Sequence, residues 1–367
     1  MKRIVMILAA AIAVLAMILS VSAAPSDGDD KSFDVTYTLK DVTRTVHFDG
    51  PADKVVVFGY AAALTVIDTG KTDKLYACDK YGDDAFSESK LERNCKTIAN
   101  LSSSNVDLIY STLVQAVDAK EFSKDDAVIL TTMTTAAENV RSKLAEAGFT
   151  HVIFYGSMEE YGDIVQCVKE IEQIVGSEKN LHKNMEYVYD KVSSALKNEP
   201  KKDALFVWYT PSSGWGYGNT GSLSVSLINA GGGNNLGYNA GSKEGIIYDK
   251  SGVVQRLESS PECVIFLDSG YIRSYGGSVD KFVSEVMGGD QGKHKICIVE
   301  HAWNNYDPES ADGLWSMASV MHPDKISGDV PVYEGSGSGN DNTLLYIGIA
   351  AAIVIIAAIA IFFVRSR

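Results

Sequence analysis

The segment Tyr161–Asn198, YGDIVQCVKEIEQIVGSEKNLHKNMEYVYDKVSSALKN, decides the fold because it carries a helical pattern without any strand signal. Its apolar residues keep helical spacing in two runs, Ile164, Val168, Ile171, Ile174 and Val175, then Leu181, Met185, Val188, Val192 and Leu196. Gly176 interrupts the pattern and Pro200 ends it. Such spacing gives a helix one apolar face. We therefore expect one helix followed by a longer one, forming a connector over residues 161–199.

The stretch before the connector alternates between strand-like and helix-like segments. Short apolar runs such as Lys54–Gly59, Ala127–Leu130 and His151–Tyr155 are separated by helical patterns such as Asn105–Ala119. Strands that are apolar on both faces and separated by helices predict a parallel sheet covered on both sides. We therefore expect an N-terminal α/β lobe over residues 33–160.

A second alternating series follows the connector. The apolar runs Ala204–Trp208, Cys263–Leu267 and Lys295–Val299 have the length of buried strands, and helical patterns separate them. A glycine-rich loop follows the first run. Gly231–Gly233 follows a helix, so it stops that helix rather than cradling a phosphate. We expect a C-terminal α/β lobe over residues 201–330.

These patterns predict an α/β fold of two lobes with parallel sheets, joined by a long rigid helix. Two lobes held in this way leave a cleft between them. In open α/β sheets ligands bind at the carboxyl ends of the strands, so we expect the ligand cleft between the lobes.

Residues 1–24 are typical of an export signal. Lys2 and Arg3 precede the apolar run Ile4–Val21, and Val21-Ser22-Ala23 supplies the small residues that a signal peptidase accepts. Because the apolar run is long for a signal, an uncleaved N-terminal anchor is the alternative.

A second hydrophobic block predicts a membrane anchor at residues 344–364. The block holds no charged side chain and is long enough to cross a bilayer core of about 30 Å as one helix. Arg365 and Arg367 follow, and basic residues stay on the cytoplasmic side. We therefore expect a single-pass protein of the cell membrane with its folded domain outside the cell. Residues 334–343 read as a flexible Gly/Ser linker.

The charge and the histidines exclude several classes of function. The formal net charge is −14, which argues against a nucleic-acid partner because polyanions need a basic surface. His47, His151, His182 and His294 show no mutual spacing for a metal site, so none is predicted. The chain has no G-x-S-x-G elbow and no serine at a recognisable distance from a histidine. We therefore expect no enzyme, and no catalytic residues are assigned.

The five cysteines form no C-x-x-C pair. Cys78 and Cys95 flank one loop, and we expect them to form a disulfide, which would persist outside the cell. The other three lie in apolar periodic runs, where a buried free thiol is the ordinary interpretation. Asn100-Leu-Ser102 is a glycosylation sequon.

Short motifs occur in a defined order over residues 40–327. They are Val42-Thr-Arg-Thr-Val46, Pro51-Ala-Asp-Lys-Val-Val-Val57, Lys71-Thr-Asp-Lys74, Leu227-Ile-Asn-Ala-Gly-Gly232, Pro261-Glu-Cys-Val-Ile265 and Gly313-Leu-Trp-Ser-Met-Ala-Ser-Val-Met-His-Pro323. In order and spacing they resemble the substrate-binding proteins of iron–siderophore, haem and vitamin B12 ABC importers, the helix-hinged class of periplasmic binding proteins. The resemblance implies two Rossmann-like lobes with limited hinge motion and an ABC permease as partner.

Aromatic and polar residues gather just after the predicted strand ends. The candidate ligand-binding residues are Tyr60, Tyr81, Tyr209, Trp215, Tyr217, Tyr271, Arg273, His301 and Trp303, with Tyr275 and Tyr306 beside them. Aromatic faces suit flat or bulky ligands such as corrin, haem or catecholate, and a guanidinium would pair with an anionic group of the ligand. The alternative is that these are ordinary loop aromatics that pack on the lobes.

His301 has two interpretations. An imidazole is a good ligand for iron or for the metal of a haem or corrinoid. A lone histidine, however, is more often structural.

The combined prediction is an extracytoplasmic substrate-binding protein that captures a small metal complex and delivers it to an ABC permease. The expected ligand is a ferric siderophore or haem; a corrinoid such as cobalamin is the alternative ligand. A surface-anchored interaction protein without a transport role is the alternative function. By analogy, a C-terminal anchor in place of a lipid-bearing cysteine is typical of archaea.

Overall fold

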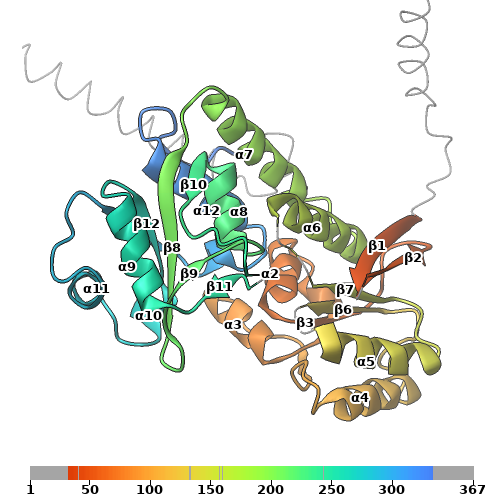
Figure 1. The fold of residues 1–367 in the computed structure, drawn as a ribbon. Helices are drawn as coiled ribbons and strands as arrows, with labels where there is room; N and C mark the ends of the chain where they lie inside the picture. Colours follow the sequence, from red (N-terminus) through yellow and green to blue (C-terminus); the bar gives the residue numbers. More distant parts are fainter. Residues whose placement is uncertain are drawn as a thin grey trace, which may run out of the picture.

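Two α/β lobes lie side by side in the computed structural model, which describes residues 32–39, 41–131, 134–156, 158, 160–242 and 244–333 (Figure 1). The predicted export signal, linker and anchor lie outside these ranges. Within them, no helix is both long and apolar enough to cross a membrane.

The first lobe consists of a hairpin and a parallel sheet. The hairpin pairs β1 (Phe33–Leu39) with β2 (Val42–Phe48) in antiparallel fashion. The strands of the sheet are, in spatial order, β5 (Lys96–Thr97), β4 (Leu75–Cys78), β3 (Val55–Phe58), β6 (Ala127–Thr131) and β7 (Val152–Tyr155). Its helices are α2 (Tyr60–Asp68), η1 (Thr72–Lys74), α3 (Lys80–Glu88), α4 (Val106–Asp118) and α5 (Thr134–Glu146). Every residue of β3 and β6 is buried, as expected for a parallel sheet covered on both faces.

A glycine turn links β3 to α2. Gly59 has a backbone φ of 100°, which residues other than glycine rarely adopt. Its N–H donates a hydrogen bond to Asp79 Oδ1 at 3.2 Å. A Cβ at this position would collide with the Thr131 hydroxyl. The turn therefore starts α2 directly at the end of the strand, and it places Tyr60 at the carboxyl edge of the sheet.

Two helices connect the lobes, α6 (Tyr161–Val175) and α7 (Leu181–Leu196). Gly176 ends α6 in the left-handed conformation, with a φ of 66°. The start of α6 lies beside the middle of α7, where the Tyr161 and Tyr189 rings stack at 5.8 Å. The connector therefore consists of the two helices that the periodicity predicts, and they pack against each other instead of forming one continuous long helix.

A buried carboxylate fixes the corner of the connector. Glu172 accepts hydrogen bonds from the backbone N–H groups of Leu181 at 2.9 Å and His182 at 3.1 Å. Its Oε2 also lies 2.5 Å from His182 Nδ1. These contacts satisfy the free N–H groups at the start of α7, so α6 itself supplies the cap of the next helix.

The second lobe contains a mixed sheet. Its strands are, in spatial order, β11 (Ile246–Ile247), β9 (Gly214–Gly218), β8 (Lys202–Thr210), β12 (Val264–Asp268) and β13 (Lys295–Val299), with β10 (Gly233–Asn235) also paired to β8. Its helices are α8 (Leu223–Ala230), α9 (Lys250–Ser259), α10 (Gly270–Arg273), α11 (Val279–Val286), η2 (Ala302–Asn304) and α12 (Ser310–Met321). Strands β10, β8, β12 and β13 are parallel, whereas β8–β9 and β9–β11 are antiparallel. The parallel part of this sheet agrees with the prediction, and β9 and β11 add an antiparallel edge that the sequence pattern did not predict.

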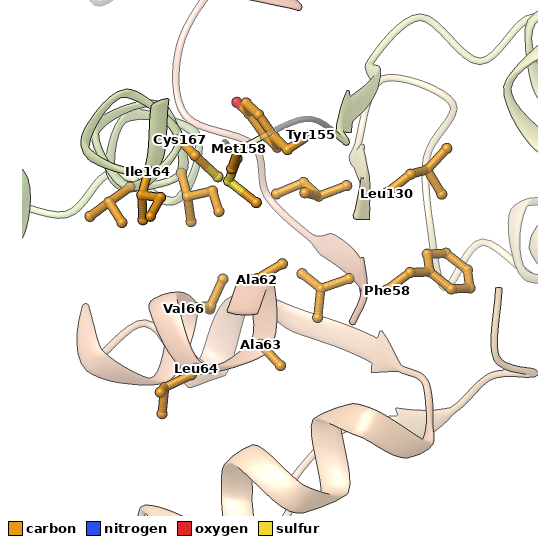
Figure 2. Packing of buried hydrophobic residues seen from close by; sticks show 14 of the residues in the cluster. Phe58, Ala62, Ala63, Leu64, Val66, Leu130, Tyr155, Met158, Ile164 and Cys167 are labelled. Atoms are coloured by element: carbon orange, nitrogen blue, oxygen red, sulfur yellow. The ribbon is translucent and has the colours of Figure 1, made fainter. Parts of the chain in front are cut away.

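The apolar core of the first lobe continues into the connector. Figure 2 shows Ala62 and Val66 of α2 facing Ile164 and Cys167 of α6. The same buried cluster includes Leu314 and other residues of α8 and α12, so the connector and part of the second lobe share one core with the first lobe. A separate cluster fills the outer side of the second lobe, under α9 and α11.

Candidate ligand-binding site

A small polar pocket lies between the two lobes. Its volume is about 290 Å³. The first lobe lines it with residues of α3 and the second with residues of α10 and the segment after β13, namely Asp84, Ser87, Glu88, Gly270, Arg273, Ser274 and His301. The walls follow strands β4, β12 and β13 at their carboxyl ends, which is the position where ligands of open α/β sheets bind.

Glu88 lines this pocket and contacts both lobes. The Tyr60 hydroxyl of its own lobe donates a hydrogen bond to its carboxylate. From the other lobe, Arg273 Nη2 lies 2.8 Å from Glu88 Oε1 and His301 Nδ1 lies 3.4 Å from the same oxygen. The Tyr60 and His301 rings meet edge to face at 5.1 Å. The lobes are thus bridged by their own side chains at the mouth of the predicted cleft.

The surroundings of Glu88 keep its carboxyl group ionised. Burial alone would raise its pKa, but the hydrogen bonds from Tyr60 and Arg273 and the charge of His301 outweigh burial and lower the pKa below its usual value. The hydrogen bond between Arg273 and Glu88 also raises the pKa of Arg273. Burial, followed by the bond to Glu88, raises the pKa of Tyr60 well above its usual value. The pocket therefore holds a carboxylate, a guanidinium and a neutral phenol at neutral pH.

Asp268 lies at the end of β12, next to this group. It is buried, and its Oδ2 accepts a hydrogen bond from Gly270 N at 2.8 Å. Burial raises its pKa to about 6, against the opposing effects of the Gly270 bond, His301 and Arg273. Asp268 therefore shapes the start of α10, and so the position of Arg273.

Further carboxyl groups line the interface beyond Tyr60. Asp307 is fully buried. Its burial has the largest effect on its pKa and the charge of Glu309 the next largest, and together they raise that pKa well above the usual value. Burial and the charges of Glu309 and Asp312 raise the pKa of Asp68, at the end of α2, to about 7. Among the residues that the structure describes, no three His, Cys, Asp or Glu side chains are placed to hold a metal ion.

Three of the predicted residues come together in this pocket: Tyr60, Arg273 and His301. Two others do not reach it. Tyr81 lies on α3 with 43 % of its surface exposed, and the Lys80 ammonium lies over its ring at 4.9 Å. Trp303 lies in η2 and packs against the shared core.

Four predicted residues belong to the core of the second lobe instead. Trp215, Tyr217 and Tyr271 are 5 %, 2 % and 1 % exposed, and Tyr209 packs against them. The Tyr209 ring lies 4.8 Å from that of Trp215 and 5.2 Å from that of Tyr271. For this group the interpretation as packing aromatics holds.

The burial of these aromatics follows from β9, which we expected to be a loop. Successive side chains of a strand point to opposite faces. In Gly214–Gly218, GWGYG, both aromatics therefore fall on one face and the glycines on the other. A Cβ at Gly216 would lie 2.8 Å from the Ile247 carbonyl oxygen, so the neighbouring strand approaches too closely for any side chain.

Sequence reasoning missed Glu88 because it missed α3. The segment KYGDDAFSE is polar, short and contains a glycine, so its apolar spacing is weak. One signal was present. Asp79 precedes the helix as its N-cap, and its side chain accepts a hydrogen bond from Tyr81 N.

The expected disulfide is a pair of free thiols in this structure. The sulfurs of Cys78 and Cys95 are 3.4 Å apart. The bond itself stays a prediction.

A larger cavity, of about 750 Å³, lies between α6, α7 and α8. Its polar residues include Glu160, Glu186 and Asp190 and no basic side chain. Its lining includes no residue of the first sheet or of helices α2 to α5. We therefore take the inter-lobe pocket as the candidate site.

Comparisons with known proteins support the predicted two-lobed fold. No family model matches the sequence, and no curated protein matches it. Among solved structures, the chain is similar to CeuE of Helicobacter pylori in a nickel–histidine complex, with a TM-score of 0.57 and 13 % identity over 80 % of this chain and 90 % of that one. It is also similar to the periplasmic heme-binding protein RhuT of Roseiflexus, with a TM-score of 0.53 and 12 % identity over 74 % and 98 %. The vitamin B12-binding protein BtuF of Vibrio cholerae gives a TM-score of 0.52 and 16 % identity over 74 % and 98 %. The chain therefore has the two-lobed fold of periplasmic binding proteins.

Proposed function

We propose that this protein is the extracytoplasmic substrate-binding component of an ABC importer and that it captures a small, polar metal chelate, such as a ferric siderophore, for delivery to a permease. One observation carries the proposal. The pocket at the carboxyl ends of the strands receives charged side chains from both lobes, with Glu88 on one side and Arg273 and His301 on the other.

The chemistry of the pocket favours a polar chelate over a flat macrocycle. Sites for large apolar ligands are lined mainly by apolar and aromatic side chains. Here the lining is charged or small, and three of the aromatics expected to stack on haem or corrin, Trp215, Tyr217 and Tyr271, are buried in the second lobe. Solved structures of similar fold carry nickel–histidine or belong to an Fe³⁺-hydroxamate transport system, which fits this ligand class.

Glu88 occupies the position that an anionic ligand would take. Its carboxylate bonds to Arg273 and lies beside His301. A chelate with carboxylate or hydroxamate oxygens would replace Glu88 at the guanidinium, because bidentate binding of anions is what guanidinium groups do best. Binding would then release the bridge between the lobes and re-form it through the ligand, which shifts the balance between two lobe arrangements.

The sequence patterns at the two ends of the chain support placement at the cell surface. An export signal at residues 1–24, a linker at 334–343 and an anchor at 344–364 would hold the lobes outside the cell, as in archaeal surface proteins. The described chain ends at Tyr333, whose N–H donates to Asn184 Oδ1 on α7 at 2.9 Å.

Calorimetric titration of the full chain in detergent tests the proposal. We expect a ferric hydroxamate, ferric citrate or the nickel–histidine complex to bind with a Kd below about 10 μM. Haemin and cobalamin should bind more weakly. Tighter binding of haemin or cobalamin would reassign the ligand class, and failure of all five would favour a surface interaction protein without a transport role.

A further inference from the structure

Two thiols face each other behind the ligand pocket. Cys78 is the last residue of β4 and is buried, while Cys95 lies beyond α3 and is half-buried. Their sulfurs are 3.4 Å apart and are not bonded. A disulfide bond is about 2.05 Å long, so a small approach of the two sulfurs would allow it. No other two cysteine sulfurs in the described chain are in contact.

The surroundings of the pair make one thiol reactive. Arg93 Nε donates to the Cys95 carbonyl at 3.1 Å, and Arg93 Nη2 donates to the Cys78 carbonyl at 3.0 Å. The hydrogen bond from Cys78 and the charge of Arg93 lower the pKa of Cys95 to about 7, although burial opposes them. The same shared hydrogen bond, together with burial, raises the pKa of Cys78 well above its usual value. Because the thiolate is the attacking species, Cys95 reacts first.

The pair encloses the helix that carries Glu88. Helix α3 runs between the two cysteines, and Gly82 packs directly on Cys78: a Cβ there would lie 2.7 Å from the Cys78 Cβ and closer still to its sulfur. The carboxyl end of the same helix places Glu88 against Arg273. A bond between the sulfurs would tie the end of β4 to the chain that leaves α3, and so would hold both ends of the helix.

We propose that Cys78 and Cys95 form a reversible disulfide that holds α3, and with it Glu88, in place at the inter-lobe pocket. The reaction is thiol–disulfide exchange with a small external disulfide. The Cys95 thiolate attacks one sulfur of that disulfide and expels a thiolate; the Cys78 sulfur then attacks Cys95 and expels the second. Two protein S–H groups become one S–S bond, and the external disulfide becomes two thiols that carry both protons. The effect of the disulfide on the order of α3 does not depend on the proposed function, whereas any effect on ligand affinity rests on it.

Mass spectrometry and hydrogen exchange on the full chain test the proposal. The protein is reduced with dithiothreitol and one half is then oxidised with oxidised glutathione. We expect the oxidised half to lose the mass of two hydrogens, with a linked peptide pair that contains Cys78 and Cys95. Amide exchange over residues 80–88 should be about tenfold slower in the oxidised half, since local opening of the helix is then restrained. The variant Cys95→Ser should show neither change, while Cys297→Ser should behave as the parent protein does.

Absence of the linked peptide would overturn the proposal, and so would a linked protein whose exchange over 80–88 is unchanged. Titration of both halves with a ferric hydroxamate separates the effect of the disulfide on α3 from its effect on ligand affinity. Weaker binding by the reduced half supports the extension to ligand affinity. No binding by either half, with slower exchange in the oxidised one, contradicts the proposed function and leaves the role of the thiol pair supported.

Discussion

Arg273 Nη2 of the second lobe lies 2.8 Å from Glu88 Oε1 of the first, so an ion pair closes the pocket in which we expect the ligand. About half of the Arg273 side chain and a quarter of the Glu88 side chain remain exposed. Ion pairs with this degree of exposure contribute little stability, typically below about 1 kcal/mol. The pair can therefore be exchanged for a ligand at low cost in free energy.

Replacing Arg273 by alanine should weaken binding of a ferric hydroxamate by about tenfold or more, since a charged anchor of this kind is worth about 2 kcal/mol. Calorimetric titration measures the effect. The matched control is Lys281→Ala, which removes the same charge from the same lobe and lies on α11, away from the pocket lining. An equal loss of affinity in both variants would show that only the overall charge matters.

Replacing Glu88 by glutamine should have the opposite effect. The change removes the carboxylate that competes for Arg273, so an anionic chelate no longer has to displace a charge. We expect affinity to rise by up to about fivefold, because the competing ion pair is worth up to about 1 kcal/mol. Weaker binding by this variant would mean that Glu88 itself contacts the ligand or its metal.

Trp215 and Tyr81 were both expected at the cleft, and the structure separates their roles. Trp215 is buried against Phe282 at 5.2 Å between ring centroids, and its Nε1 donates to Glu285 at 3.3 Å. Its replacement by alanine should lower the free energy of unfolding by about 3–5 kcal/mol, because it leaves a large cavity. Tyr81→Ala, at an exposed position, should change it by less than about 0.5 kcal/mol. Chemical denaturation compares the two, and similar values would contradict the assignment.

Asp68 should make stability depend on pH. Burial raises its pKa from 3.8 to about 7 in the folded protein. The folded state therefore keeps a proton that the unfolded chain loses near pH 4, and stability falls as pH rises from about 4 to 7. Asp68→Asn removes this dependence. We expect the variant to match the parent protein near pH 3.5 and to be more stable by at least about 1 kcal/mol at pH 8. Equal stability of the two at pH 8 would refute this.

Gly82 should not tolerate a methyl group. A Cβ there would lie 2.7 Å from the Cys78 Cβ, a contact that forces α3 away from β4. Gly82→Ala should therefore destabilise the protein by about 1–3 kcal/mol, the usual effect of overpacking. Gly162→Ala in α6 is the control. Nothing lies within 4 Å of its added methyl, so higher helix propensity should stabilise by up to about 1 kcal/mol. Thermal unfolding distinguishes the two outcomes.

Strong periodicity was enough to predict most of the fold. The apolar runs around Val55–Phe58 and Ala127–Thr131 are wholly buried strands, and their composition permits little else. The helical run before Gly176 is α6, and the interruption that we read there is a corner. What periodicity cannot show is that Glu172 draws the start of α7 back onto α6, because that depends on a contact between side chain and backbone.

The candidate site was less accessible to sequence reasoning. Arg273 and His301 were found because they follow predicted strands directly. Glu88 was missed because it ends a short polar helix whose position is set by Gly59, Asp79 and Cys78 rather than by its own pattern. Trp215 was misplaced since glycines in GWGYG suggested a loop, whereas alternation with aromatics was the better guide.

If the protein binds a ligand as we propose, the corner held by Glu172 limits how far the shape of the ligand-bound form can differ from that of the empty form. Because hydrogen bonds to a buried carboxylate fix this corner, we expect the two lobe arrangements that a ligand would shift to differ only by a small displacement. Under the proposed function, a permease would then recognise the ligand-bound form from the few side chains at the mouth of the pocket. It would not rely on a large change in overall shape.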